Sequence, residues 1–240
     1  MEEMNFDYLW EGGPEIAQAD HFRYGTDSIL LGHFAPVNGA RRAIDLGCAS
    51  GVISLLLLAR SDRIRVTGLE LDENAVSLAR QNMVHNAFQD RCEIIHGDIR
   101  CVKELFPAGA FDLVVSNPPY FKTDAGGVSP HEGRAKARIE MVCTLDDLCL
   151  SAGYLCRWGG RCAFVYRPDR LPELFAAMTK HGIEPKRLRM VCHTASSRPG
   201  LALVEGRRGG KPGLNVEPFL ILKKEDGTDT EEILTIYRRG

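Results

Sequence analysis

The chain has 240 residues, of which 44% are hydrophobic and 26% are charged, and its formal net charge is −2. This composition is ordinary for a soluble globular protein, and the length allows one large domain or one domain with a small extension. The near-neutral charge neither requires nor excludes a nucleic-acid partner, so local basic clusters must decide that question.

Short apolar runs alternate with helical stretches between residue 41 and about residue 168. The runs predict strands over residues 43–46, 65–71, 92–95, 113–116 and 161–166, and the stretches predict helices over residues 52–60, 73–86 and 145–155. Such alternation is typical of a mostly parallel sheet with helices on both faces, the Rossmann-like α/β class. We expect residues 1–40 to form a separate N-terminal lid or strand segment, followed by one domain over residues 41–240.

The last third of the chain has a different pattern. One more helix is expected over residues 170–181, and three short strands are expected over residues 187–192, 201–205 and 218–222. No helix fits between the first two of these strands, so at least one antiparallel strand should close the sheet near the C-terminus.

Two features of the sequence concern its compartment. The first residues lack the basic region and apolar core of a signal peptide, and the apolar run 53–59 is far too short to span a bilayer. The eight cysteines include no Cys-x-x-Cys pair and mostly lie in apolar stretches, which favours buried reduced thiols over metal ligands or disulfides. We therefore expect a cytoplasmic protein with no metal and no membrane partner.

A glycine-containing loop, residues 45–51, joins the first expected strand to the first helix. In an open α/β sheet, ligands bind in the crevice at such a position. Only Gly47 and Gly51 fit the Gly-x-Gly-x-x-Gly pattern of dinucleotide-binding loops, so a nicotinamide cofactor is weakly supported.

Two acids follow at the next strand ends. Glu70 ends the second strand, where a carboxylate can accept both hydroxyls of a ribose, and Asp98 follows the third strand, where it can accept from an adenine amino group. Leu71 and Ile99 would supply apolar faces for that ring. The alternative is structural: either acid could cap a helix, although Asp72 is a better cap than Glu70.

The fourth expected strand is followed directly by Asn117, Pro118, Pro119 and Tyr120. Prolines fix the backbone and present carbonyl oxygens, Asn117 adds a side-chain acceptor, and Tyr120 offers a ring on which a flat base can stack. Two acceptors on one conjugated amino group would localise its lone pair for attack on an electrophile. A simple turn after a strand is the alternative, but the preceding acids favour a joint site.

Together these residues resemble class I S-adenosylmethionine-dependent methyltransferases, and the Asn-Pro-Pro-Tyr turn resembles the amino-methylating subgroup. Residues 22–31, Phe-Arg-Tyr-Gly-Thr-Asp-Ser-Ile-Leu-Leu, resemble the leading motif of the bacterial valine-tRNA adenine-37 N6-methyltransferase family. Residues 209–214, the strand beginning at Pro218 and residues 230–237 resemble the Gram-positive branch of that family. The resemblance extends from about residue 20 to residue 240.

The resemblance implies roles for particular residues. Asp45, Gly47 and Gly51 would line the methionine part of S-adenosylmethionine, Glu70 would hold its ribose and Asp98 its adenine. The site would be covered by three residues of the leading motif, Gly25, Thr26 and Asp27, and the target amino group would be held by residues 117–120. The chain departs from the family pattern at Ala49, where a glycine is common and an alanine tolerates a left-handed backbone poorly, and at Ile139, where a histidine is common.

The resemblance implies that the substrate is an adenine in tRNA. A single-stranded loop is the expected place for it, because a base must leave its stack to enter such a pocket. The preferred RNA contacts are Arg134, Lys136 and Arg138, just beyond the catalytic turn. Two other basic clusters, residues 186–189 and 207–211, are weaker candidates. We expect a monomer.

Two other functions fit parts of the pattern. A protein glutamine N5-methyltransferase uses the same tetrapeptide but typically has an N-terminal helical domain, and only about 40 residues precede the first strand here. A cofactor-binding or RNA-binding module with a degraded site would be consistent with the departures at Ala49 and Ile139.

Overall fold

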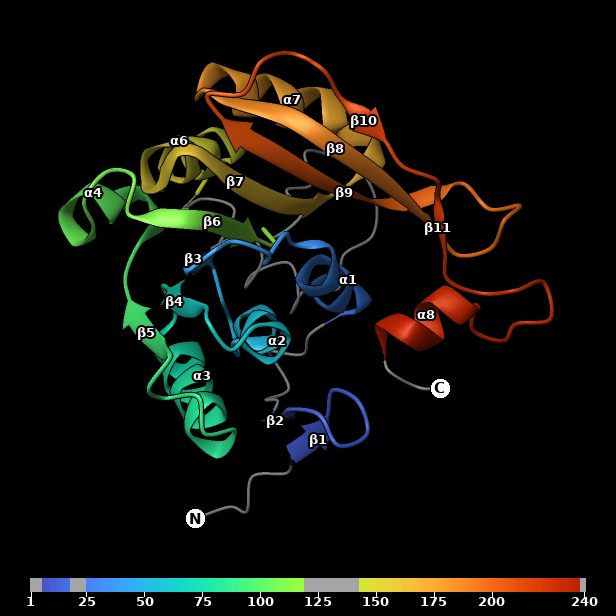
Figure 1. Cartoon of the computed structure of the whole chain (residues 1–240), viewed down its shortest axis with the longest axis horizontal. Helices are drawn as coiled ribbons and strands as arrows, with labels where there is room; N and C mark the ends of the chain where they lie inside the picture. Colours follow the sequence, from blue (N-terminus) through green and yellow to red (C-terminus); the bar gives the residue numbers. More distant parts are fainter. Residues whose placement is uncertain (1–5, 18–24, 119–142, 238–240) are drawn as a thin grey trace, which may run out of the picture.

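The computed structural model describes residues 6–17, 25–118 and 143–237, and Figure 1 shows how their elements are arranged. The main sheet has the strand order β10-β8-β9-β7-β6-β3-β4-β5, with β11 paired to β8. Its strands are β3 (Arg42–Leu46), β4 (Arg65–Glu70), β5 (Cys92–His96), β6 (Phe111–Ser116), β7 (Cys156–Tyr166), β8 (Ile183–Cys192), β9 (Pro199–Arg208), β10 (Asn215–Val216) and β11 (Leu220–Ile221). A separate hairpin pairs β1 (Phe6–Tyr8) with β2 (Glu15–Ala17).

Helices connect the strands. They are α1 (Thr26–Phe34), α2 (Val52–Arg60), α3 (Glu73–His85), α4 (Val102–Leu105), α6 (Leu145–Leu155), α7 (Leu171–Lys180) and α8 (Glu231–Ile236), with short 3₁₀ turns η1 (Ile99–Cys101) and η2 (Pro168–Arg170). The expected helices over residues 52–60 and 145–155 are confirmed with these bounds. The strand expected over residues 161–166 is longer than predicted and begins at Cys156, because an irregular register lets it follow β6 from Phe111 onward.

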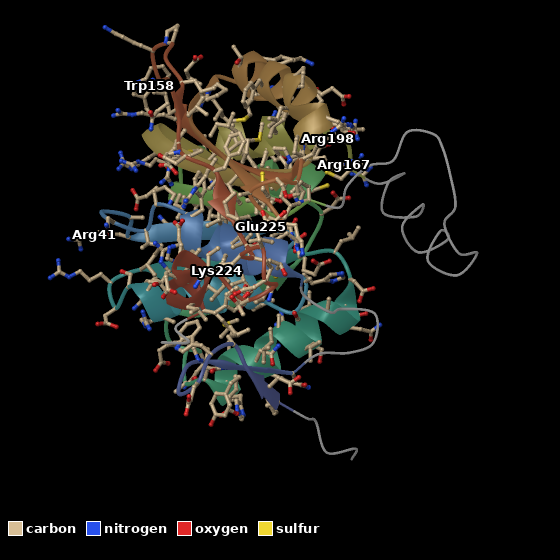
Figure 2. The ribbon with its side chains drawn as sticks, turned by 90° about the vertical axis from the view of Figure 1, so that its right-hand side faces the viewer. Arg41, Trp158, Arg167, Arg198, Lys224 and Glu225 are labelled. Carbon is tan, nitrogen blue, oxygen red and sulfur yellow. The ribbon has the colours of Figure 1, made fainter. Side chains whose placement is uncertain are left out.

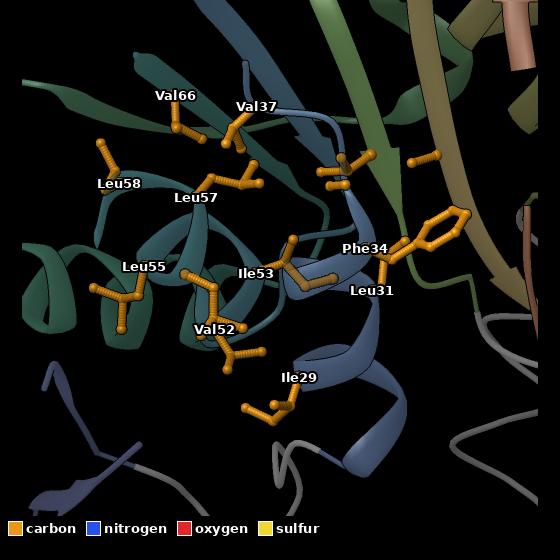
Figure 3. Close-up of a cluster of buried hydrophobic side chains, with 14 of the residues drawn as sticks. Ile29, Leu31, Phe34, Val37, Val52, Ile53, Leu55, Leu57, Leu58 and Val66 are labelled. Atoms are coloured by element: carbon orange, nitrogen blue, oxygen red, sulfur yellow. The ribbon is translucent and has the colours of Figure 1, made fainter. Parts of the chain in front are cut away.

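The side chains of each central strand alternate between two hydrophobic cores. Ala43 and Ile44 of β3 point into different cores, as do Leu113 and Val114 of β6. One core contains residues of α1, α2, α3 and α8, and the other contains residues of α4, α6 and α7. Figure 3 shows how α1 and α2 pack against each other in the first core. The predicted helices on both faces of the sheet are therefore confirmed.

The sheet is parallel from β5 across to β7 and changes direction at β9. β9 is antiparallel to both β7 and β8, so the expected antiparallel strand near the C-terminus is confirmed. As a result, β7 and β8 end at the same edge of the sheet as β3 to β6, and β9 begins at that edge.

Among the described residues, no helix is both long and apolar enough to cross a membrane. The eight cysteines are free thiols, and five of them are buried.

Candidate functional site

Polar residues lie at the ends of four neighbouring parallel strands: Asp45 in β3, Glu70 at the end of β4, Asp98 after β5 and Asn117 after β6. The register of these strands is continuous from β5 to β6, so their carboxyl ends meet at one edge of the sheet. We call this edge the carboxyl edge. The four residues that the sequence predicts to share a crevice therefore all lie at the carboxyl edge.

The loop between β3 and α2 has three residues with positive φ. Gly47 has φ 73°, Ala49 has φ 47° and Gly51, which caps α2, has φ 85°. A Cβ atom on Gly47 would meet only the Cδ1 atom of Ile99, at 3.9 Å, so the backbone here borders open space that a ligand can approach. Ala49 adopts the left-handed conformation, as a glycine at this position would, although this is unfavourable for a residue with a Cβ atom.

Asp45 lies fully buried just before this loop. Its Oδ2 atom accepts a hydrogen bond from the Ser54 hydroxyl at 2.9 Å, whereas its Oδ1 atom has no partner. Burial raises the pKa of this carboxyl from 3.8 to about 7, and the hydrogen bond from Ser54 only partly opposes that rise. An unsatisfied acceptor of this kind fits a positively charged amino group, such as that of a methionine moiety.

Glu70 is held by the backbone around it. Its Oε2 atom accepts from the Ala49 N–H at 2.9 Å, and its Oε1 atom accepts from the N–H groups of Leu71 and Asp72 at 2.8 and 2.9 Å. A carboxylate has about four acceptor positions. This arrangement leaves about one of them free, fewer than the two required for both hydroxyls of a ribose. Glu70 also fixes the glycine-containing loop to the end of β4.

Asp98 is engaged locally. It caps η1 by accepting from the Arg100 N–H at 2.8 Å, and it pairs with the Arg100 guanidinium at 2.6 Å. The hydrogen bond from the Arg100 side chain lowers the pKa of Asp98. Since the Arg100 side chain is 46% exposed, a ligand amino group could exchange with it at little cost. Asp98 therefore caps a helical turn, which is the structural role that the sequence left open for it. Asp72 caps α3, as expected.

Two apolar side chains border the same crevice. Leu71 is 45% exposed, although it directly follows a central strand, and Ile99 lies half-buried beside Gly47. An exposed leucine at this position fits the expected contact with one face of an adenine ring.

The turn that begins at Asn117, directly after β6, is fixed by two serines. Ser116 donates from its hydroxyl to the Leu46 carbonyl at 2.7 Å, which ties the end of β6 to the end of β3. The Asn117 amide donates from Nδ2 to the Ser28 hydroxyl of α1 at 2.9 Å, so its own carbonyl oxygen is directed away from α1. Pro118 is buried behind it. The turn thus presents one oriented side-chain acceptor.

The start of α1 lies next to this turn. Gly25 is its N-cap, Thr26 is its first residue, and the Asp27 carboxylate accepts from the Ser28 N–H at 2.9 Å. The hydrogen bond between Ser28 and Asn117 therefore joins the leading motif to the turn after β6.

Several predicted residues lie outside the described ranges: Pro119, Tyr120, Arg134, Lys136, Arg138 and Ile139. The two weaker basic clusters are described, and they lie at different places. Residues 186–189 lie in the middle of β8, where Arg189 pairs with Leu203 of β9, so strands β9 and β7 stand between this cluster and Asn117. Residues 207–211 include the end of β9, which pairs with the start of β8 and with Arg161 of β7, and this cluster lies at the opposite edge of the sheet.

Sequence reasoning missed two polar residues that build the site. Ser28 is buried within an otherwise apolar helix. Asn82 is fully buried in α3, where its amide donates to the Ser50 carbonyl at 2.9 Å and to the Ala17 carbonyl at 3.2 Å. Asn82 could have been found from the sequence, because it lies seven residues after Ala75 and therefore on the apolar face of that helix, where a polar side chain is unusual.

The described residues contain no cluster of three or more His, Cys, Asp or Glu side chains that could hold a metal ion. The open backbone at Gly47, the unsatisfied oxygen of Asp45 and the exposed Leu71 fit an organic cofactor with a charged and an aromatic part.

Comparison with known proteins identifies the family. Residues 17–129 match the family described as "MTS: Methyltransferase small domain". A relative from Tolumonas auensis, named tRNA1(Val) (adenine(37)-N6)-methyltransferase, is 32% identical over 215 residues, which cover 89% of this chain and 87% of the relative. The chain belongs to this methyltransferase family. A relative with the same name from Porphyromonas gingivalis is 35% identical over 191 residues, covering 77% of this chain and 74% of the relative.

The family has consequences for the expectations above. The protein is a methyltransferase, and its class uses a cofactor of the S-adenosylmethionine type. Both relatives come from Gram-negative bacteria, so the expected Gram-positive branch is not supported. A solved structure described as a predicted O-methyltransferase from Agrobacterium tumefaciens superposes with a TM-score of 0.73 at 20% identity, covering 89% of this chain and 96% of that chain. This likeness confirms the Rossmann-like methyltransferase fold.

Proposed function

We propose that this family member transfers a methyl group from S-adenosylmethionine to the N6 atom of adenine 37 in valine tRNA. Its relatives carry this activity in their names, and they match most of the chain. The single observation that carries the proposal is the position of Asn117, which stands after β6 with its amide nitrogen held by Ser28. The amide carbonyl is thereby free to accept from an exocyclic amino group.

The chain's own residues act by positioning. The Asn117 side-chain oxygen and the Pro118 carbonyl accept the two hydrogens of the adenine amino group, and Tyr120 stacks on the base. Two acceptors on one nitrogen concentrate its lone pair, which points along the line of attack. S-adenosylmethionine, when bound, supplies the electrophilic methyl group and the sulfur leaving group. The proton of the methylated nitrogen passes to water.

The cofactor would lie along the first half of the carboxyl edge. Its methionine part would be lined by Asp45, Gly47 and Gly51, and its ribose would donate to the free acceptor of Glu70. Asp98 would exchange Arg100 for the adenine amino group, with Leu71 and Ile99 against the ring. Gly25, Thr26 and Asp27 would cover this site, and Arg134, Lys136 and Arg138 would contact the RNA.

The same proposal includes the form of the enzyme. We expect a monomer that needs no metal, and we expect the target adenine to lie in a single-stranded loop. Residues 1–40 would act as the lid segment and residues 41–240 as the methyltransferase domain.

Nucleoside mass spectrometry of tRNA treated with the protein tests the activity. N6-methyladenosine should appear with wild-type protein and with Asn38→Ala, an exposed asparagine in a loop, but not with Asn117→Ala. Binding of the cofactor, measured by calorimetry, should persist in Asn117→Ala. Label in protein instead of tRNA would support the glutamine methyltransferase, and label in neither would support a binding module. Near-wild-type turnover by Asn117→Ala would refute the role of this residue.

A further inference from the structure

The carboxyl edge has two halves of different charge, and Asn117 stands between them. Acids lie at the ends of the strands on one side: Asp45, Glu70, Asp72 and Asp98. The other half is formed by the end of β7, the end of β8 and the start of β9. It carries Arg167, Arg170, His193 and Arg198, with Asp169 and Glu173 paired to the first two, so its charge is net positive. The strand order places β6 at the boundary. A polyanion approaching Asn117 is repelled by the first half and attracted by the second.

Arg167 lies close to the catalytic turn. The register pairs Ser116 of β6 with Phe164 of β7, so Asn117 is level with Val165. Arg167 directly follows the end of β7, two residues beyond Val165, and caps η2. It therefore lies at the carboxyl edge, at the end of the strand next to β6, where a guanidinium can meet the phosphates next to a base held by Asn117.

Arg167 and Arg198 are more exposed and less tightly paired than Arg170, so their guanidinium groups can bind a ligand more easily. Arg198 is exposed, and it makes no ion pair with the described residues. Arg167 pairs with Asp169 at 2.7 Å, but both side chains are at least 40% exposed, so this pair contributes little and can open. Arg170 is different, because its side chain is only 17% exposed and is held by Glu173.

The loop that carries Arg198 is held by its own hydrogen bonds. The Thr194 N–H donates to the Ser197 hydroxyl at 3.0 Å, and that hydroxyl donates to the Thr194 carbonyl at 2.9 Å. The Lys223 N–H donates to the His193 carbonyl at 2.8 Å, which fixes the start of the loop to the β11 segment. Arg198 is therefore presented from an ordered loop, which reduces the entropy lost on binding.

A second basic surface competes with this one, but it faces the other way. Trp158 is 75% exposed and lies near Arg207 and Arg208 at the opposite edge. Arg161, which pairs with Arg207, is level with Leu113, four residues before Asn117, whereas Arg167 and Arg198 lie beyond the level of Asn117, at the carboxyl edge. Figure 2 shows Arg167 and Arg198 on one side of the molecule and Trp158 on the other. Of these two surfaces, only the first lies at the carboxyl edge, where the chain leaves β6 at Asn117.

We propose that Arg167 and Arg198 form a binding site for the RNA backbone, which holds the phosphates that flank the target base. This inference rests on the proposed function and adds where the substrate lies. The base enters between the two halves of the carboxyl edge, with its backbone over the ends of β7 and β8. The Thr194 hydroxyl lies in the same loop and can donate to the same strand, whereas the Ser196 hydroxyl donates to Glu225 at 3.4 Å.

The test measures binding of an RNA hairpin that copies the anticodon stem and loop of valine tRNA, between about 50 and 200 mM salt. The double variant Arg167→Gln with Arg198→Gln should reduce the slope of log affinity against log salt by about 1.4, since each contact with single-stranded RNA contributes about 0.7. The double variant Arg207→Gln with Lys211→Gln removes the same charge from exposed positions at the opposite edge, and it should leave the slope unchanged.

Two further measurements make the result decisive. Arg167→Lys with Arg198→Lys should restore the slope, because a phosphate contact requires the charge, and all variants should unfold at the wild-type temperature. Methylation of the same hairpin is followed in parallel. If wild type methylates it and the Gln pair keeps the wild-type slope, the RNA site is refuted while the activity stands. If wild type binds but does not methylate, the proposed function fails, and the slopes still test the site. A loss confined to Arg207→Gln with Lys211→Gln would place the RNA at the opposite edge.

Discussion

Asp45 should make the stability of this enzyme fall with rising pH. The carboxyl is fully buried, one oxygen has no partner, and its pKa is raised to about 7. The informative substitution is Asp45→Asn, which keeps the size of the side chain and an acceptor for the Ser54 hydroxyl but cannot titrate.

The sign follows from the direction of the pKa shift. Between the ordinary value of 3.8 and about 7, the folded protein retains a proton that the unfolded chain has released. The stabilisation is therefore complete below about pH 4 and is lost as the pH rises to about 7. One pH unit of such linkage is worth about 1.4 kcal/mol, so about 2 kcal/mol should be lost between about pH 5.5 and about pH 8. Asp45→Asn does not titrate and does not lose this stability. The free energy of unfolding of the variant, relative to that of wild type, should therefore rise by about 2 kcal/mol between about pH 5.5 and about pH 8.

Urea unfolding of wild type and Asp45→Asn at these two pH values measures the difference. Other titrating groups are common to both proteins and cancel. Asp226→Asn is a suitable control, because hydrogen bonds from Thr228 lower the pKa of that exposed carboxyl, so it does not titrate in this range. A stability difference between wild type and Asp45→Asn that is the same at both pH values would refute a carboxyl that titrates near neutrality.

Three further predictions concern the site. If Asp45 faces the charged methionine part, its ionised fraction rises from about 0.1 to about 0.9 between about pH 6 and 8, so cofactor affinity should rise by up to about tenfold in wild type. Calorimetry should find no such rise in Asp45→Asn, and an equal rise in both proteins would contradict the assignment. Ala49→Gly should stabilise the protein by about 0.5–1 kcal/mol in thermal unfolding, because relief of the left-handed alanine, about 1–2 kcal/mol, exceeds the added freedom of the unfolded chain. Ala176→Gly, exposed within α7, should instead destabilise by about 1 kcal/mol, and a similar loss in Ala49→Gly would show that the loop is not strained. Ser28→Ala should lower kcat by about ten- to a hundredfold with cofactor affinity unchanged, because the Asn117 amide loses its partner; an unchanged kcat would remove Ser28 from the positioning of that amide.

The sequence was sufficient to place the main residues of the site at one edge. Strand periodicity located β3 to β6 to within a few residues, and parallel pairing then requires that Glu70 and Asn117 meet at the carboxyl ends. The conformation of Ala49 was not decided by the sequence, because an alanine at a position where relatives carry glycine could either adopt a left-handed backbone or reshape the loop; the structure has the left-handed backbone.

The sequence could not show which side-chain acceptors of the site are already occupied by hydrogen bonds within the protein. Glu70 is a strand-end acid in the sequence, but only the folded loop shows that three backbone N–H groups already occupy it. The pairing of Asp98 with Arg100 depends on the tight turn of η1. The bond between Ser28 and Asn117 joins residues 89 positions apart, which local patterns do not reveal. The division of the chain at residue 40 stays a prediction.

The three acids of the carboxyl edge differ in what a ligand can gain from them. Glu70 is nearly satisfied by the backbone, and Asp98 has a partner that it must exchange, so neither offers much new hydrogen bonding. Asp45 has an oxygen with no partner and a charge that burial opposes. A buried group left unsatisfied destabilises the free protein by about 1–3 kcal/mol, and a cationic ligand can recover this free energy on binding. Glu70 therefore acts mainly to shape the loop, whereas under the proposed function Asp45 would regain this free energy when a charged cofactor binds.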